Sequence, residues 1–189
     1  DAVADGNQPI HITFTATTSS DTAYNGIIPG NIALTNIDDD TPGFTVSAIS
    51  GNPREDGTQA SFTIVLTSEP TANVTVAFAS DDPSEGVTTT TQVVFTPSNW
   101  AAPQTVAVAG QNDDVADGNQ PFQIDFSPAT STDPGYAGRT PPSVDVTTLD
   151  DETAGFIVST IDRNTNETGE QGEFTVRLTS EPTQAVTVH

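Results

Sequence analysis

Cysteine is absent from this chain of 189 residues, and basic residues are scarce, since only four lysines and arginines stand against 26 aspartates and glutamates. Without cysteine, the protein has neither disulfide bonds nor thiol chemistry. The net charge of −22 argues against nucleic acid and anionic membranes as partners, because phosphate contacts require lysine and arginine. No apolar run approaches the length of about 18 residues that membrane insertion requires. The charge favours cations as partners instead.

A repeat of 112 residues organises the chain. Residues 3–9 (VADGNQP) recur as residues 115–121. When residues 1–77 are laid over residues 113–189 without a gap, 40 of the 77 pairs are identical. A self-match at a fixed period is typical of tandem structural units. We therefore predict that the same unit is used more than once along the chain.

The repeat predicts three parts: the C-terminal part of a preceding repeat (1–40), one complete β-sandwich repeat (41–152) and the N-terminal part of a following repeat (153–189). The first part holds the last two strands of its unit, near residues 10–16 and 31–37. The third part holds the first three strands of its unit. Neither part can close a sandwich alone, so each needs strands from a longer chain or from a neighbouring molecule by edge pairing.

Short runs of threonine, valine, isoleucine and phenylalanine alternate with clusters of glycine, proline, asparagine and aspartate, which is the pattern of strands and turns. Val74, Val76 and Phe78 illustrate the period of two, which buries one face of a strand and leaves the other in water. The prediction is an all-β fold of seven-stranded antiparallel immunoglobulin-like β-sandwich repeats in tandem. The seven strands of the complete repeat are expected at residues 43–49, 60–67, 73–79, 90–96, 104–109, 122–127 and 143–149.

Strand direction predicts where the acidic residues gather. If successive strands alternate in direction, every second connection lies at the same end of the sandwich. Of the 15 acidic residues between positions 43 and 152, 11 fall in such connections. This end is also the junction with the next repeat, because the acidic run at 150–152 leads within a few residues into the next first strand.

So many carboxylates repel one another unless a cation neutralises them. Calcium takes about six to eight oxygen ligands in flexible geometry and fits carboxylate-rich loops. Zinc is disfavoured, because cysteine is absent and His11 and His189 are the only histidines. The alternative is an acidic face that serves only solubility. We predict Ca²⁺ at the junction, where it fixes the angle between repeats.

Five motifs carry a resemblance to a known family. They are residues 55–57 (EDG) ahead of 62–66 (FTIVL), 93–97 (VVFTP), 110–114 (GQNDD) and 150–156 (DDETAGF). The chain resembles the Calx-β family, which occurs in regulatory domains of sodium–calcium exchangers and as tandem modules in large bacterial surface proteins. The resemblance covers the complete repeat and both terminal parts.

The resemblance implies a set of calcium ligands. In the complete repeat these are Glu55, Asp82, Asp113, Asp114, Asp117, Asp150, Asp151 and Glu152. In the preceding repeat they are Asp38, Asp39 and Asp40, with Asp1 and Asp5, and in the following repeat Glu167 matches Glu55. The chain departs from a strict repeat where Thr168 replaces Asp56, Ala2 replaces Asp114 and Asp40 replaces Glu152, which leaves the number of ions per junction open.

Aromatic residues are expected at the end opposite the acids. Trp100, Tyr24 and Tyr136 fall in connections there, where they either stack on sugars or pack over the sandwich. Catalysis is not expected, because the chain has neither a Gly-x-Ser-x-Gly motif nor a cysteine nucleophile. A pair of carboxylates at a junction suits metal binding better than glycoside hydrolysis.

These observations predict an extracellular or cell-surface array, structural or adhesive, that calcium rigidifies at the junctions between repeats. Its expected partners are neighbouring repeats of the same or another copy, with neither nucleic acid nor membrane insertion. A fibre formed by strand exchange between chains, and contacts with glycans or a cell surface, stay open. The alternatives are a carbohydrate- or surface-binding adhesin module and a non-catalytic module of a large secreted enzyme.

Overall fold

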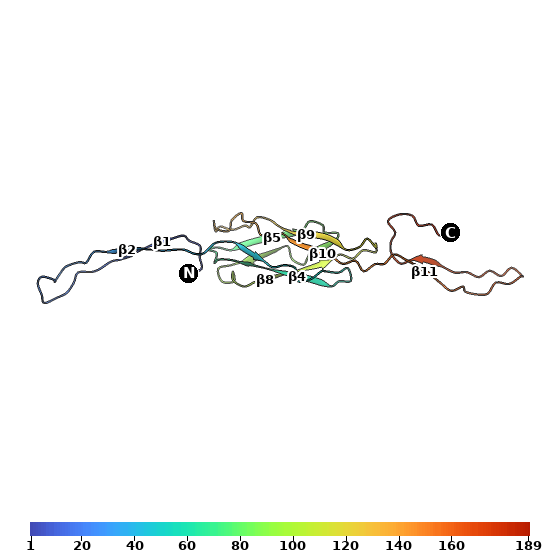
Figure 1. Ribbon diagram of the computed structural model, residues 1–189, viewed down its shortest axis with the longest axis horizontal. Coiled ribbons are helices and arrows are strands. Elements are labelled where there is room, and N and C mark those ends of the chain that lie inside the picture. Colours follow the sequence, from blue (N-terminus) through green and yellow to red (C-terminus); the bar gives the residue numbers. More distant parts are fainter.

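The computed structural model describes all 189 residues as an elongated all-β molecule (Figure 1). A two-layer sandwich occupies the middle, and a two-stranded ribbon extends from each of its ends. No helix of a length and apolarity that would cross a membrane is present. The predicted all-β class and the antiparallel pairing of the strands are confirmed.

The sandwich consists of two four-stranded sheets. The strand orders are β10-β9-β5-β7 in one sheet and β3-β4-β8-β6 in the other. The bounds are β3 (Phe44–Val46), β4 (Gln59–Leu66), β5 (Val74–Ser80), β6 (Gly86–Thr88), β7 (Gln92–Phe95), β8 (Gln104–Gly110), β9 (Gln120–Phe126) and β10 (Val144–Thr148).

The core lies between the sheets and follows the alternation of the sequence. In β4, Phe62, Ile64 and Leu66 are buried while the intervening residues are partly exposed. Phe62, Phe78 and Phe126 meet edge to face, with ring centroids 5.6 to 6.4 Å apart. Full burial of one such side chain contributes about 1.5–3 kcal/mol, so a core of 17 buried residues closes the sandwich without disulfides.

The central unit has eight strands rather than the predicted seven. The additional strand is β6, which pairs with β8, whereas β7 pairs with β5 in the opposite sheet. The sequence hides β6 because it begins at Gly86, and glycine is rare in strands. A Cβ atom at Gly86 would lie 2.3 Å from Cζ of Phe122. Close packing of the two sheets therefore requires glycine at position 86, and this glycine is the reason that β6 was not predicted.

The ribbons at the two ends are β1 (Gln8–Ile12) with β2 (Ile32–Asn36), and β11 (Phe156–Val158) with β12 (Val176–Leu178). Their registers equal those of β9–β10 and β3–β4 at a spacing of 112 residues. The third strand predicted for residues 153–189 does not form. Its counterpart β5 pairs with β7 and β9, and residues 153–189 contain no counterpart of either.

The ribbons leave apolar side chains in water. Ile12 is 45% exposed although its counterpart Ile124 is fully buried. Leu34 and Phe156 are also exposed, at 42% and 54%. Each ribbon thus carries one face of a sandwich without the sheet that would cover it.

Candidate metal centre

Four segments of the chain meet at the end of the sandwich from which residues 153–189 continue. They are the β3–β4 connection, the β5–β6 connection, the β8–β9 connection and the segment after β10. Each brings acidic residues to this end, as the strand directions require. The electrostatic coupling of Glu55 and Glu85 to acids of the other segments places these groups near one another.

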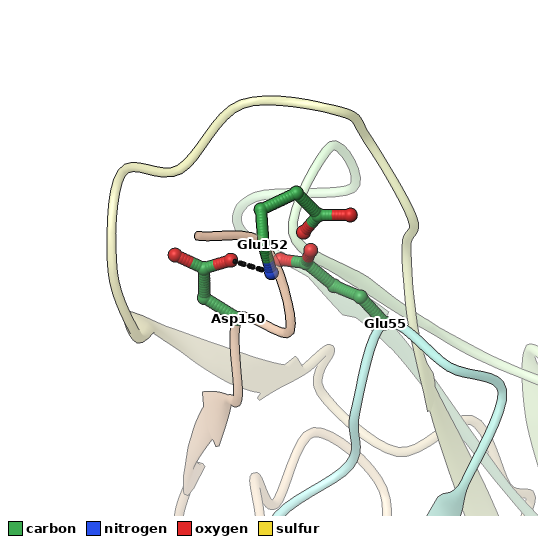
Figure 2. A group of neighbouring side chains, drawn as sticks. All are labelled: Glu55, Asp150 and Glu152. Atoms are coloured by element: carbon green, nitrogen blue, oxygen red, sulfur yellow. Dashed lines mark hydrogen bonds between the residues drawn. The ribbon is translucent and has the colours of Figure 1, made fainter. Parts of the chain in front are cut away.

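The centre of the cluster consists of Glu55, Asp150 and Glu152. One carboxylate oxygen from each lies within 4.8 Å of the other two (Figure 2). The backbone N–H of Glu152 donates to Oδ1 of Asp150 at 2.7 Å. Glu55 is only 7% exposed. Oε2 of Glu55 and Oε2 of Glu152 are both buried and have no hydrogen-bond partner. Such atoms are rare in folded proteins and require an explanation.

Backbone contacts hold the β3–β4 connection against the end of β10. The N–H of Leu149 donates to the carbonyl of Pro53 at 2.9 Å, and the N–H of Glu55 donates to the carbonyl of Leu149 at 3.3 Å. Arg54 forms a parallel bridge with Leu149. These contacts are between backbone groups, so the backbone itself holds Glu55 beside Asp150.

The β8–β9 connection is fastened to the same point. Gly118 has φ of +83°, a conformation that favours glycine. Its N–H donates to Oδ2 of Asp150 at 2.7 Å. Asp113 accepts a bond of 2.7 Å from the N–H of Val115, which turns the loop at its beginning. Asp150 therefore organises two segments through backbone donors.

The pKa values of Glu55 and Asp150 are shifted in opposite directions. Burial raises the pKa of Glu55 to about 8, and the neighbouring carboxyl group of Glu152 and the charges of Asp113 and Asp150 raise it further. Backbone N–H groups of Glu152 and Gly118 lower the pKa of Asp150. The cluster thus contains an ionised aspartate beside a glutamate that resists ionisation while no cation is present.

Glu85 is a member of the cluster that the sequence-based ligand set omits. Burial and the charges of Asp117, Asp82 and Asp113 raise its pKa. Its carbonyl accepts from the hydroxyl of Thr148 at 2.8 Å, which fixes the residue next to β10. The signal was its position three residues after Asp82 in an acidic connection. The motif resemblance did not include it.

Asp82 also lies in this connection, where hydrogen bonds from Ser84 lower its pKa. Asp113 and Asp117 of the predicted set are exposed, but the charge of Asp113 acts on Glu55 and Glu85, and that of Asp117 acts on Glu85. No such effect on the cluster is found for two further residues of the set. The side chains of Asp114 and Asp151 are exposed and make no hydrogen bond within the chain. The carbonyl of Asp114 instead accepts from the N–H of Glu181 at 2.6 Å, which joins the loop to the C-terminal ribbon.

The N-terminal acids repeat much of this arrangement. Gly6, with φ of +79°, donates its N–H to Oδ2 of Asp38 at 2.6 Å. The N–H of Asp40 donates to Oδ1 of Asp38 at 2.9 Å. A cavity of about 140 Å³ is lined by Asp1, Asp5, Gln8, Asn36, Ile37, Asp38, Asp39 and Asp40. Glu167, the counterpart of Glu55, is exposed in the C-terminal ribbon.

The aromatic residues differ in their exposure. Tyr136 is 1% exposed, and its hydroxyl donates to the carbonyl of Ser68 at 2.7 Å. Trp100 is partly buried against the core. Stacking of Tyr136 on a sugar is therefore excluded in this conformation, and the alternative that it packs over its own sandwich is correct. Tyr24 is 65% exposed.

A donor set made of carboxylates, with backbone carbonyls nearby, suits a hard divalent cation. The two buried unpaired oxygens are the specific feature, because an ion between them would supply the partner that each lacks. Glu55, Asp150 and Glu152 would hold such an ion, with Asp113 on the adjacent loop.

No protein-family model matches the chain, and no curated protein matches it. Among solved structures, it is similar to the crystal structure of calcium binding domain CBD12 of CALX1.1. The TM-score is 0.44 at 14% sequence identity, over 72% of this chain and 70% of that chain. A similarity of this size does not establish family membership. The Calx-β resemblance therefore stays a prediction from the motifs.

Proposed function

We propose that this chain is a non-catalytic structural segment of an extracellular or cell-surface array in which Ca²⁺ locks consecutive units. The single observation that carries the proposal is the pair of buried, unpaired oxygens of Glu55 and Glu152 beside Asp150. Burial of carboxylates without a partner costs several kcal/mol, and a bound cation removes that cost.

The chemistry of the donors favours calcium over other ions. Calcium accepts mono- and bidentate carboxylates at variable coordination numbers, whereas Mg²⁺ demands a near-ideal octahedron and keeps its waters. Cysteine and histidine, the preferred ligands of zinc, are absent from the cluster. The residues gathered at this end supply enough oxygen atoms for about six to eight ligands.

Mechanical coupling follows from where the ligands sit. Asp113 and Asp150 belong to a loop and a strand end that also form the junction with residues 153–189. Val115 forms a parallel bridge with Glu181, and the carbonyl of Asp114 accepts from the N–H of Glu181. An ion that orders residues 113–118 therefore also orders the contact across the junction. The same bridge occurs between Val3 and Glu69 at the other junction.

Calorimetric titration of calcium into the full chain tests the proposal. We expect binding that Glu55→Gln weakens at least about tenfold, because the substitution removes a ligand charge. The control is Asp56→Asn, since Asp56 is exposed and pairs with Arg54 at 3.1 Å outside the cluster. Scattering profiles should show a longer, stiffer particle with calcium than with chelator. Binding that ignores Glu55, or dimensions that ignore calcium, would refute the proposal.

Other expected roles are less well supported. An adhesin that binds sugars through Tyr136 is not favoured, because that ring is buried and hydrogen-bonded to Ser68. Nothing in the fold favours a module of a secreted enzyme over a structural segment. Strand exchange into a fibre stays a prediction, and the exposed apolar faces of the two ribbons favour it.

A further inference from the structure

The junctions at the two ends of the sandwich are built alike, and each has two points of attachment. The first point is the linker itself. Thr67, which follows β4, donates its N–H to the carbonyl of Gly43 at 3.0 Å and its hydroxyl to the carbonyl of Thr41 at 2.6 Å. At the C-terminal junction, the N–H of Thr179 donates to the carbonyl of Gly155, also at 3.0 Å. The chain that enters each sheet is thus fastened to the end of the neighbouring strand.

The second point lies two residues further along the chain. The N–H of Glu69 donates to the carbonyl of Ala2 at 2.7 Å, and Glu69 forms a parallel bridge with Val3. At the C-terminal junction, Glu181 bonds to the carbonyl of Asp114 at 2.6 Å. Donor and acceptor are backbone groups, so the bond is the same whether alanine or aspartate supplies the carbonyl. The contact therefore does not depend on an acidic side chain.

The turn that carries Glu69 is held from inside the sandwich. Ser68 is fully buried, and the hydroxyl of Tyr136 accepts from its N–H at 3.1 Å and donates to its carbonyl at 2.7 Å. The N–H of Thr71 donates to Oδ2 of Asp133, which is 7% exposed, at 2.7 Å. These bonds fix the backbone on both sides of Glu69 and leave its N–H for a carbonyl from another segment. A donor fixed in this way binds at little cost in conformational entropy.

The loop that supplies the carbonyl has internal bonds of its own. The N–H of Val3 donates to Oδ1 of Asp1 at 3.1 Å, and the N–H of Asp5 donates to the carbonyl of Val3 at 2.9 Å. Residues 113–118 repeat both bonds, at 2.7 and 3.0 Å. All donors and acceptors in these bonds belong to the protein. Neither the shape of the loop nor its bond to the turn therefore requires an ion.

We propose that the turn at residues 67–69 is a docking site for the loop of the unit before it, and that this contact prevents rotation about the linker without calcium. A linker fastened at one point still allows two units to turn about it. The bond from Glu69 to residue 2 attaches a different segment of the preceding unit, and two attachments define an orientation. Residues 179–181 provide the same pair of attachments at the other junction.

The docking site and the candidate metal centre act on one loop from two sides. Oδ2 of Asp150 accepts from the N–H of Gly118 within the centre, whereas Val115 of the same loop meets the turn of the next unit. An ion at the centre adds stiffness to a junction whose orientation the turn has already fixed. The inference deepens the proposed array function and rests on it, because it specifies how one unit receives the unit before it.

Nuclear magnetic resonance of the full chain in chelator tests the inference directly. A scalar coupling across the hydrogen bond should connect the nitrogen of Glu69 with the carbonyl carbon of Ala2. The amide of Glu69 should also exchange at least about tenfold more slowly than in an unstructured peptide. The pair of Glu181 and Asp114 should behave in the same way. Absence of the coupling together with fast exchange at both junctions overturns the proposal.

Two substitutions at one position separate the backbone bond from the charge. Glu69→Pro removes the N–H, whereas the matched control Glu69→Gln keeps it and removes only the charge. The chain has no cysteine, so nitroxide labels at Thr35→Cys on β2 and Thr105→Cys on β8, both exposed, report orientation across the junction. In pulsed electron paramagnetic resonance in chelator, the ratio of ordered to disordered junctions should fall at least about fivefold in Glu69→Pro. Glu69→Gln should leave the ratio unchanged.

Orientation that is equally well defined in both Glu69 variants overturns the proposal. Urea denaturation should give the same midpoint for both variants; if Glu69→Pro also weakens the sandwich, the coupling experiment on the unmodified chain decides. Calcium binding at the Glu55 cluster, measured by calorimetry, should be the same in both variants. Failure of the docking site is thereby distinguished from failure of the metal assignment.

Discussion

Glu55 and Glu152 face each other with carboxylate oxygens within 4.8 Å, and each has one buried oxygen without a hydrogen-bond partner. They come from connections at opposite ends of the central unit's sequence, so the complete fold is needed to bring them together. Two carboxylates this close and this buried repel each other. Either one of them therefore keeps its proton, or a cation lies between them. The choice between proton and cation governs the expected behaviour of the protein.

Removal of calcium should lower the melting temperature of the central sandwich. A ligand at 100 times its Kd stabilises the folded state by about 2.7 kcal/mol, which corresponds to about 10 °C in a domain of this size. Differential scanning calorimetry with calcium and with chelator measures the shift. Magnesium at the same concentration is the control and should restore only a small part of it. Equal melting temperatures in calcium and chelator would contradict the metal assignment.

In chelator, stability should fall as the pH rises from 5 to 8. The pKa of Glu55 is raised from 4.5 to about 8, so the folded state keeps a proton in this window that the unfolded state has lost. The folded state therefore becomes less favourable as the pH increases through the window. Asp150, whose pKa is lowered from 3.8, contributes its change only at more acidic pH. The melting temperature in chelator should fall by at least about 5 °C between pH 5 and pH 8.

The control for the pH effect is Glu55→Gln, which cannot ionise. Its melting temperature in chelator should vary much less between pH 5 and 8. Saturating calcium should also flatten the wild-type profile, because the ion replaces the proton. A wild-type profile in chelator that rises with pH would mean that another group dominates.

Strand alternation and strand direction made much of this fold predictable. The alternation of Phe62, Ile64 and Leu66 identified β4 and its buried face. Direction alone brought Glu55 and Asp150 to the same end, because antiparallel strands return alternate connections to one side. The alternation within a strand and the direction of successive strands depend only on the spacing of residues along the chain, so both can be predicted from the sequence.

Other features depended on packing that no local pattern records. Strand β6 was not predicted because it begins with Gly86. Packing against Phe122, a residue distant in sequence, requires glycine at this position. Strand direction placed Glu85 at the acidic end, but only the structure shows that the hydroxyl of Thr148 bonds to its carbonyl and fixes it beside β10. Asp114 and Asp151 stay predicted ligands from motif position alone, since their side chains are exposed and make no hydrogen bond within the chain. In the run at 150–152, Asp150 and Glu152 are partly buried while Asp151 is exposed, and the sequence alone does not predict which acids of a run turn inward.

Tyr136→Phe should destabilise the central sandwich by about 1–3 kcal/mol. The hydroxyl of Tyr136 bonds to the N–H, carbonyl and side chain of Ser68. Ser68 is fully buried, so its groups lose their partner without gaining water. Urea denaturation of dilute protein measures the change. Tyr24→Phe is the control and should leave stability unchanged, because the hydroxyl of Tyr24 makes no hydrogen bond within the chain. Equal effects of the two substitutions would argue against a stabilising role for the hydrogen bonds between Tyr136 and Ser68.

Gly118→Ala should weaken calcium binding and stability together. A Cβ atom at Gly118 meets nothing within 4 Å, so the cost comes from the backbone, whose φ of +83° is unfavourable for alanine by about 1–2 kcal/mol. Relaxation of that strain moves the N–H away from Oδ2 of Asp150, which then loses its orientation in the cluster. The matched control is Gly51→Ala, since Gly51 also has open space around it but no positive φ. Its stability should change by no more than about 0.5 kcal/mol, with calcium affinity unchanged. If Gly118→Ala lowers stability but leaves calcium affinity intact, the 113–118 loop does not transmit order between the ion and the junction.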